Sequence, residues 1–197
     1  MSDPAGGTGI SQCRPVILAS ASPRRSALLR EAGAAFADMR IVTSHAEEGA
    51  DPLENAFLKA EAVARMNPQA LVIGADTVIR FEGETIGKPA DLEDAKRILA
   101  KLSGRTHDVA TGVCVRCVEA DILVRFEDIT HVTFRTLTPE AVDAYVKAVN
   151  VLDKAGAYAI QEHGEDIVEK IDGSLTNVIG LPVERLKETV EYLLKLA

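Results

Sequence analysis

The sequence predicts an α/β fold, and three observations indicate it. Short apolar runs at residues 16–19 and 71–75 are suited to strands that a sheet buries on both faces. Strong helix-start signals lie between and after these runs, for example at residues 51–54. Two long segments of alternating character, 107–118 and 122–135, predict an antiparallel hairpin. Strands that alternate with helices in this way are typical of a sheet flanked by helices.

Length alone allows one large or two small domains, and we interpret the chain as one domain with two lobes. The chain has 197 residues, of which 47% are hydrophobic and 26% are charged, so it can bury one sizeable core. Residues 1–14 begin with a stretch rich in glycine, serine and proline and are expected to form a disordered tail. The domain is therefore expected to span residues 15–197.

The charge and the apolar pattern argue against several classes of protein. A net charge of −8 is unsuited to a protein that coats DNA or RNA, because neutralising many phosphates requires a basic surface. No apolar run approaches the roughly 20 residues of a membrane span, and residues 1–14 lack the features of a signal peptide. We therefore expect a soluble, cytoplasmic protein that binds neither nucleic acid nor membrane.

The first strand leads through a polar turn into a helix with an unusual first turn. Ser22 can cap a helix that begins at Pro23, so Arg24 and Arg25 fall where the helix dipole disfavours each cation by about 0.3–1 kcal/mol. Free backbone N–H groups, the hydroxyls of Ser20 and Ser22 and two guanidinium groups together suit a polyphosphate. The alternative is a pair of solvated arginines on a surface helix.

The next segment predicts a strand, a loop and a second helix. Residues 36–43 are expected to be extended, and 45–49 to form a loop. The helix should begin at Asp51-Pro52 and end near Met66, with a face of small and apolar residues that packs on the sheet. Lys59 flanks that face, and the ordinary alternative for such a lysine is a solvated ammonium group.

An acid follows the second apolar strand. Residues 71–75 are expected to form a strand that Asp76 closes, and ligands of open α/β sheets gather at the carboxyl ends of strands. Asp76 is thus a candidate for metal binding or acid/base chemistry, the alternative being an aspartate that caps a turn. The chain then continues extended to a turn at residues 82–83, and Lys88 follows between a glycine and a proline, which restrict its backbone.

The second half of the chain predicts helices over 91–102 and 138–149, a strand over 167–171 and a final helix from residue 182. A turn of small residues at 153–161 lets a ligand approach the backbone, with Lys154 and Gln161 beside it, and a buried glutamine can read a base edge through its donor and acceptor. The inward face of the helix over 91–102 is expected to consist of Leu92, Ala95, Ile98, Leu99 and Leu102.

The cysteines and histidines do not have the spacing of a metal site. Cys114 and Cys117 lie on a predicted strand, where residues three apart point to opposite faces. The four histidines are scattered, with no helical i, i+4 pair.

The isolated polar residues together suit a triphosphate held by cations, with carboxylates that bind a divalent metal or activate water. No P-loop and no dinucleotide-binding glycine motif is present. The cations are Arg24, Arg25, Lys59, Lys88 and Lys154, and the acids are Glu47, Glu48 and Asp76.

Six motifs in order resemble the Maf family of nucleoside triphosphate pyrophosphatases, which are related in fold to the inosine triphosphate pyrophosphatases. The resemblance covers residues 16–194 and implies a mixed twisted sheet flanked by helices, with two lobes around a cleft. It also implies hydrolysis between the α and β phosphates with a divalent cation, Mg²⁺ or Mn²⁺, and a homodimer. The motifs are Leu18-Ala19-Ser20-Ala21-Ser22-Pro23-Arg24-Arg25, Gly74-Ala75-Asp76-Thr77, Gly87-Lys88-Pro89, Leu102-Ser103-Gly104-Arg105-Thr106-His107, Asp153-Lys154-Ala155-Gly156-Ala157-Tyr158 and Gly180-Leu181-Pro182.

The resemblance also implies roles for individual residues. Asp76 matches the catalytic acid that accepts a proton from water, and Asp76 and Glu48 are the expected metal ligands. Lys59 and Lys88 match two further functional lysines. The expected substrate-binding residues are Ser20, Ser22, Arg24, Arg25, Thr77, Lys154 and Gln161.

The chain resembles the subgroup that prefers dTTP and UTP at three positions, Arg24, Thr77 and Gln161. A neutral glutamine suits this preference because it offers both a donor and an acceptor to a pyrimidine imide. Residues 175–178 depart from that subgroup, which usually carries bulkier or aromatic residues there. Three alternatives stay open: a pyrophosphatase of 7-methyl-GTP or of broad specificity, a nucleotide-binding regulator of septation without turnover, and a phosphatase of the terminal phosphate.

Overall fold

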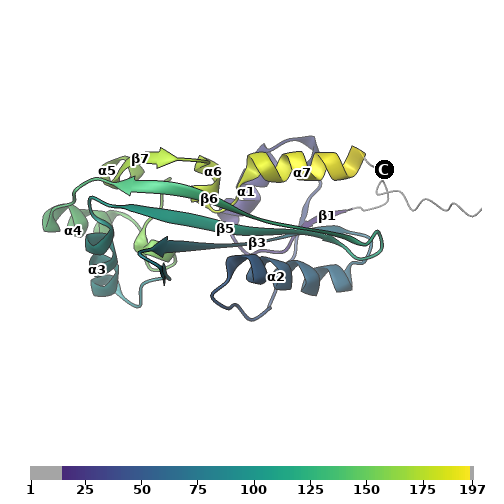
Figure 1. The fold of residues 1–197 in the computed structure, drawn as a ribbon, viewed down its shortest axis with the longest axis horizontal. Coiled ribbons are helices and arrows are strands. Elements are labelled where there is room, and N and C mark those ends of the chain that lie inside the picture. Colours follow the sequence, from purple (N-terminus) through teal and green to yellow (C-terminus); the bar gives the residue numbers. More distant parts are fainter. Residues whose placement is uncertain (1–14, 196–197) are drawn as a thin grey trace, which may run out of the picture.

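One seven-stranded mixed sheet runs through the computed structural model, which describes residues 15–195 (Figure 1). Its strands are β1 (Val16–Leu18), β2 (Arg40–Ile41), β3 (Leu71–Phe81), β4 (Glu84–Ile86), β5 (Thr106–Cys117), β6 (Ile122–Phe134) and β7 (Val168–Asp172). The order is β2-β1-β3-β5-β6-β7, and β4 pairs with β3 outside this path. Strand β1 is parallel to β2 and β3, and the other pairs are antiparallel. The predicted α/β class and mixed sheet are confirmed.

Helices cover both faces of the sheet (Figure 1). They are α1 (Pro23–Glu31), α2 (Pro52–Met66), α3 (Leu92–Leu102), α4 (Pro139–Ala148), α5 (Gly164–Ile167), α6 (Leu175–Ile179) and α7 (Val183–Lys195), with short 3₁₀ turns η2 (Ala34–Phe36) and η3 (Ala155–Ala157). None of the helices within residues 15–195 is both long and apolar enough to span a membrane. The tail predicted over residues 1–14 lies outside the described part of the chain.

The predicted helix starts are confirmed at α1, α2 and α4. Ser22, Asp51 and Thr138 each accept a backbone N–H from the first turn of the helix that follows, and a proline occupies the first helical position in all three. These caps fix where the site-bearing helices α1 and α2 begin.

Helix α2 lies against the sheet at an unusually close distance. A Cβ atom on Gly74 of β3 would be 2.2 Å from the carbonyl oxygen of Ala56, and one on Gly112 of β5 would be 2.3 Å from that of Pro52. Only glycine leaves room for this backbone contact. The N-terminal half of α2 is therefore held directly over the middle of β3.

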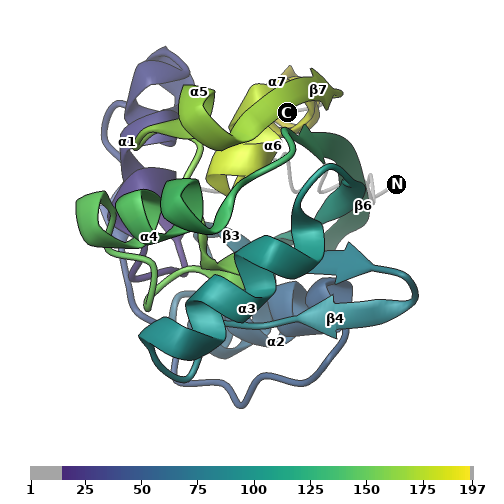
Figure 2. The same ribbon diagram turned by 90° about the vertical axis from the view of Figure 1, so that its left-hand side faces the viewer.

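Two lobes share the sheet, one toward each end of its long strands (Figure 1), and the lobe that carries α3 and α4 faces the viewer in Figure 2. In the first lobe, α2 packs on one face of β1, β3 and β5, and α1 and α7 pack on the other face. In the second lobe, α3, α4 and η3 pack around the opposite ends of β3, β5 and β6. Its core includes His107, Phe134 and Tyr158, whose rings meet edge to face at centroid distances of 4.9–5.5 Å.

The strand predicted over residues 36–43 is wrong for most of its length. Phe36 instead lies in η2 and is fully buried in the core with α1. Only Arg40–Ile41 pair as a strand, because they lie beside the short strand β1, where Ile17 and Leu18 are their partners.

The prediction that Asp76 closes its strand is also wrong. Strand β3 continues to Phe81, since β5 pairs with it without interruption from Val72 to Arg80. The strand that ends near this level is β1, whose last residue, Leu18, pairs with Ile73. Asp76 therefore lies in the interior of β3, beyond the end of its neighbour.

Smaller differences concern helices and side chains of the second half. Leu92 does not face inward but is 49% exposed, because it is the first residue of α3, whereas the other four predicted positions are buried. Helices α5 and α6 were not predicted, since four or five residues are too few for a periodic pattern. Cys114 and Cys117 do point to opposite faces of β5, as predicted, and lie in different core clusters.

Candidate active site

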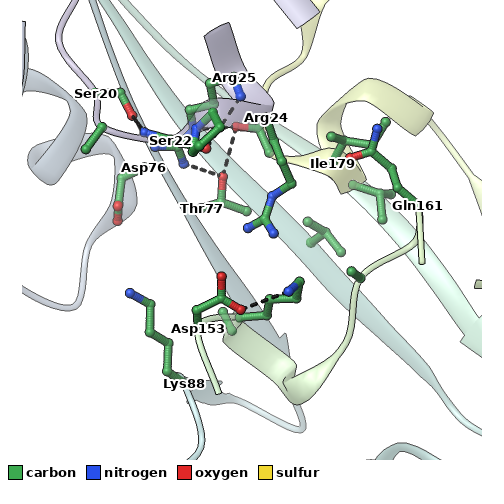
Figure 3. A pocket seen from close by; sticks show the side chains of 18 of the residues that line it. Ser20, Ser22, Arg24, Arg25, Asp76, Thr77, Lys88, Asp153, Gln161 and Ile179 are labelled. Carbon is green, nitrogen blue, oxygen red and sulfur yellow. Dashed lines mark hydrogen bonds and ion pairs between the residues drawn. The ribbon is translucent and has the colours of Figure 1, made fainter. Parts of the chain in front are cut away.

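A cleft of about 940 Å³ opens between the two lobes (Figure 3). Its walls come from the turn between β1 and α1, the middle of β3, the segment 150–162 and the end of α6. The structure brings together in this cleft all the site residues that the sequence predicted, namely Ser20, Ser22, Arg24, Arg25, Glu48, Lys59, Asp76, Thr77, Lys88, Lys154 and Gln161.

Asp76 projects from β3 toward α2, and both of its carboxylate oxygens accept hydrogen bonds from that helix. Its Oδ1 atom accepts a hydrogen bond of 2.8 Å from Lys59 Nζ, and its Oδ2 atom accepts one of 2.9 Å from Asn55 Nδ2. Asp76 is only 8% exposed. Both oxygens of this largely buried carboxylate therefore have hydrogen-bond partners, as buried polar groups require.

Lys59 links two carboxylates. Its ammonium nitrogen lies 2.8 Å from Asp76 Oδ1 and 2.8 Å from Glu48 Oε1. Lys59 is buried, so the alternative of a solvated helix lysine is wrong here. Glu48 lies on the loop before α2, and its side chain is 57% exposed. The neighbouring acid, Glu47, is exposed and does not line the cleft.

Asn55 is a site residue that the sequence interpretation missed. It lies one helical turn before Lys59 on α2 and is buried. The spacing of four residues puts Asn55 and Lys59 on the same face of the helix. A buried asparagine on the sheet-facing side of α2 was the signal that could have identified it, because buried amides require partners.

Arg25 uses its guanidinium group within the protein. Its Nε atom donates to the carbonyl oxygen of Gly180 at 2.8 Å, and Nη1 donates to that of Ala75 at 3.0 Å and, at 3.4 Å, to Ser20 Oγ. Its Nη2 atom donates to Thr77 Oγ1 at 2.9 Å (Figure 3). Burial lowers the pKa of Arg25, and the charge of Asp76 opposes that effect. Arg25 therefore joins three walls of the cleft.

Arg24 and Lys88 extend into the cleft from opposite sides (Figure 3). Within residues 15–195, neither side chain has a hydrogen-bond or ion-pair partner. Asp153 lies nearby, and its pKa is lowered by a hydrogen bond from Lys154 and, more weakly, by the positive charge of Arg24. Two unpaired cations at one cleft can bind an anionic ligand.

Lys154 and Gln161 differ from their predicted settings. Lys154 is buried, and its ammonium group donates to the carbonyl oxygen of Asn150 and to Asp153 Oδ1, and it lies 3.5 Å from Glu162 Oε1. These contacts tie the two ends of the segment 150–162 together. Gln161 is exposed rather than buried, and it lies beside Ile179 at the far side of the cleft (Figure 3).

The carboxylates of Asp76 and Glu48 fit a small divalent cation. Both donate hard oxygen ligands, and both already converge on one positive atom, Lys59 Nζ. Within the described residues no group of three or more His, Cys, Asp and Glu side chains could hold a metal ion. A site of only two carboxylates, Asp76 and Glu48, suits Mg²⁺ or Mn²⁺. These ions are commonly held by one or two carboxylates together with water and substrate phosphates.

Comparison with known proteins shows the family of the chain. The family model described as Maf-like protein matches residues 15–193. A dTTP/UTP pyrophosphatase of Akkermansia muciniphila is 48% identical over 174 residues, which are 86% of this chain and 91% of that protein. A dTTP/UTP pyrophosphatase of Bacillus anthracis is 43% identical over 181 residues, 88% of this chain and 92% of that protein. The chain therefore belongs to the family of Maf-like proteins.

Proposed function

We propose that this protein hydrolyses nucleoside triphosphates, with dTTP and UTP preferred. The products are the nucleoside monophosphate and inorganic diphosphate. The observation that carries the proposal is the pairing, in one cleft, of a carboxylate–lysine–carboxylate cluster with two unpaired cations. The cluster is Glu48, Lys59 and Asp76, and the cations are Arg24 and Lys88. The names of the relatives that are 43–48% identical support the same reaction.

The reaction forms a bond between a water oxygen and the α-phosphorus and breaks the bond from that phosphorus to the oxygen that bridges to the β-phosphate. Asp76 orients the water and accepts its proton, and Lys59 holds that carboxylate in place. Arg24 and Lys88 neutralise the departing diphosphate. Asp76 and Glu48 would hold a divalent cation, which would supply charge stabilisation and activate a bound water.

We attribute the preference for a pyrimidine base to residues at the far side of the cleft. Gln161 offers a neutral donor and acceptor, and Val178 and Ile179 provide an apolar wall beside it. Thr77 is fixed by Arg25 Nη2 and lies 2.9 Å from Thr111 Oγ1, so its hydroxyl cannot turn freely toward a base. We therefore assign the reading of the base to Gln161, with Thr77 shaping the wall.

A turnover panel tests this function. The panel contains dTTP, UTP, 5-methyl-UTP, 7-methyl-GTP, dGTP and ATP, each with Mg²⁺ or Mn²⁺, with products separated by ion exchange. Monophosphate plus diphosphate, fastest from dTTP and UTP, is the expected result. A nucleoside diphosphate plus inorganic phosphate would indicate removal of the terminal phosphate instead. Binding of nucleotide without any product would indicate a nucleotide sensor.

The family resemblance further supports a homodimer in the cytoplasm. Light scattering coupled to size-exclusion chromatography should give twice the mass of the 21.1 kDa chain. A monomer at micromolar concentration would contradict the dimer without affecting the proposed reaction.

A further inference from the structure

Asn55 uses its whole side-chain amide in hydrogen bonds to a loop and to strand β3. The backbone N–H of Gly49 donates to Asn55 Oδ1 at 2.6 Å, and Asn55 Nδ2 donates to the carbonyl oxygen of Gly49 at 2.9 Å. The same nitrogen donates to Asp76 Oδ2 at 2.9 Å. Both hydrogens of the amide nitrogen and the amide oxygen therefore have partners.

We propose that Asn55 is a positioning residue, which fixes the orientation of the Asp76 carboxylate and the place of the Glu48 loop relative to it. The proposal rests on the proposed function, because it assigns Asn55 to the reaction for which Asp76 is the base. Asn55 does not line the cleft, so it acts on the reaction through Asp76 and through the loop.

The first half of the argument concerns the Asp76 side chain. Lys59 holds Oδ1 and Asn55 holds Oδ2, so the plane of the carboxylate is set by two donors that come from one helix. A carboxylate with only one of these donors can rotate about its Cβ–Cγ bond. Because a general base must lie within hydrogen-bond reach of the proton that it accepts, such rotation lowers the fraction of productive geometries.

The second half concerns Glu48. The chain has no helix or strand between β2, which ends at Ile41, and α2, which begins at Pro52. Asn55 holds both backbone polar groups of Gly49, the residue after Glu48, in a pattern that resembles a strand pair. The backbone beside Glu48 is thereby attached to the same helix that carries Lys59.

The position of Asn55 itself is fixed by the packing of α2. The helix contacts β5 at Gly112 and β3 at Gly74, where no side chain separates the backbones. Asn55 is 3% exposed, and its amide lies between the helix, the sheet and the loop. One rigid element therefore presents both Asn55 and Lys59 to the two carboxylates.

Two substitutions of Asn55 separate positioning from packing. Asn55→Ala removes all three hydrogen bonds. Asn55→Asp keeps the shape and the acceptor for Gly49 N–H, but places an anionic oxygen against Asp76 Oδ2 and the Gly49 carbonyl. The matched control is Val63→Ala, which creates a cavity on the buried face of α2 about two helical turns beyond Asn55.

The expected result is a loss of kcat for dTTP of at least tenfold in both Asn55 variants, with KM changed less than threefold. Asn55→Asp should be no better than Asn55→Ala, although it preserves shape better. Val63→Ala should keep kcat while lowering the melting temperature. Values of kcat within threefold of wild type in both Asn55 variants, or an active Asn55→Asp variant, would overturn the proposal.

A second readout needs neither metal nor nucleotide. Hydrogen–deuterium exchange of the peptide 44–51 should be at least tenfold faster at Gly49 in Asn55→Ala and unchanged in Val63→Ala. If the wild-type protein releases no diphosphate from any triphosphate, the proposed function is wrong. The Asn55 proposal is then decided by exchange, and an unchanged rate at Gly49 refutes it.

Discussion

Lys59 and Asp76 form an ion pair 2.8 Å long, and each side chain is only 11% exposed. A buried ion pair contributes little net stability, because the loss of hydration offsets much of the attraction. Removing one partner is nevertheless expensive, since it leaves the other charge buried and unpaired. The pair is therefore better explained by the chemistry of the cleft than by the stability of the fold.

Replacing the acid should abolish turnover and preserve binding. Asp76→Asn retains the shape of the side chain but removes the proton acceptor, so kcat should fall by about 10²–10⁴-fold. The dissociation constant of dTTP, measured by calorimetry with Ca²⁺ to prevent turnover, should stay within about threefold, because Arg24 and Lys88 are intact. A variant with more than a tenth of the wild-type rate would identify a different base.

Replacing the lysine should affect both activity and stability. Lys59→Met leaves Asp76 and Glu48 without the cation between them, and the unpaired buried carboxylate should cost about 3–5 kcal/mol in free energy of unfolding. Urea unfolding at pH 7 measures this change. Arg65→Met, which breaks an exposed ion pair with Glu61 on the same helix, is the control and should cost less than about 1 kcal/mol. Equal losses in the two variants would contradict this account.

The sequence predicted the long elements because each has a local cause. Caps such as Asp51 define a helix start, and the hairpin of β5 and β6 was predicted to within one residue at its ends. The length of β3 could not be predicted, because what prolongs it past Asp76 is its pairing with β5, a contact between distant parts of the chain. Partners of this kind decide strand length more than local propensity does.

The same limit applies within the cleft. The sequence indicated that Arg25 and Lys154 are functional cations, but it could not indicate that their donors face protein acceptors. Those acceptors include the backbone carbonyl groups of Gly180 and Asn150, and no side-chain pattern shows which way a backbone carbonyl group points. Asn55 was missed for the same reason, because its partners lie in other elements of the fold: Gly49 is in a loop and Asp76 is in strand β3.

Acid should destabilise the protein through His107. Burial lowers the pKa of His107 to about 4 in the folded state, whereas the unfolded chain has a value near 6.5. Neutral, buried His107 contributes fully to the free energy of unfolding above pH 6.5. This contribution is lost as the pH falls toward 4, a change on the order of 3 kcal/mol. The free energy of unfolding, measured by urea at pH 7, 5.5 and 4.5, should fall less steeply in His107→Gln.

His131→Gln is the control for this pH dependence, because His131 is exposed and pairs with Asp108 at the surface. It should retain the acid sensitivity of the wild-type protein. If His107→Gln and the wild type lose stability in parallel between pH 7 and 4.5, the imidazole of His107 is not the source.

A side chain on Gly112 should separate α2 from the sheet. A Cβ at this position would lie 2.3 Å from the carbonyl oxygen of Pro52, a backbone atom that cannot turn away, so Gly112→Ala should cost at least about 1–3 kcal/mol. Because α2 carries Lys59, kcat should fall as well. Gly87→Ala, with no atom within 4 Å of its Cβ, is the control for the free energy of unfolding. Equal stability of the two variants would show that α2 can move without cost.

The two adjacent arginines should respond differently to substitution. Arg24→Ala removes an unpaired cation, so it should raise the KM for dTTP about tenfold while the free energy of unfolding stays within about 0.5 kcal/mol. Arg25→Ala leaves the carbonyl oxygens of Gly180 and Ala75 without their donor, at a cost of about 1–3 kcal/mol for each unpaired group. Steady-state kinetics and urea unfolding of both variants decide between the two roles. A stable Arg25→Ala protein with only a raised KM would mean that Arg25 turns from its protein acceptors to the phosphates when substrate binds.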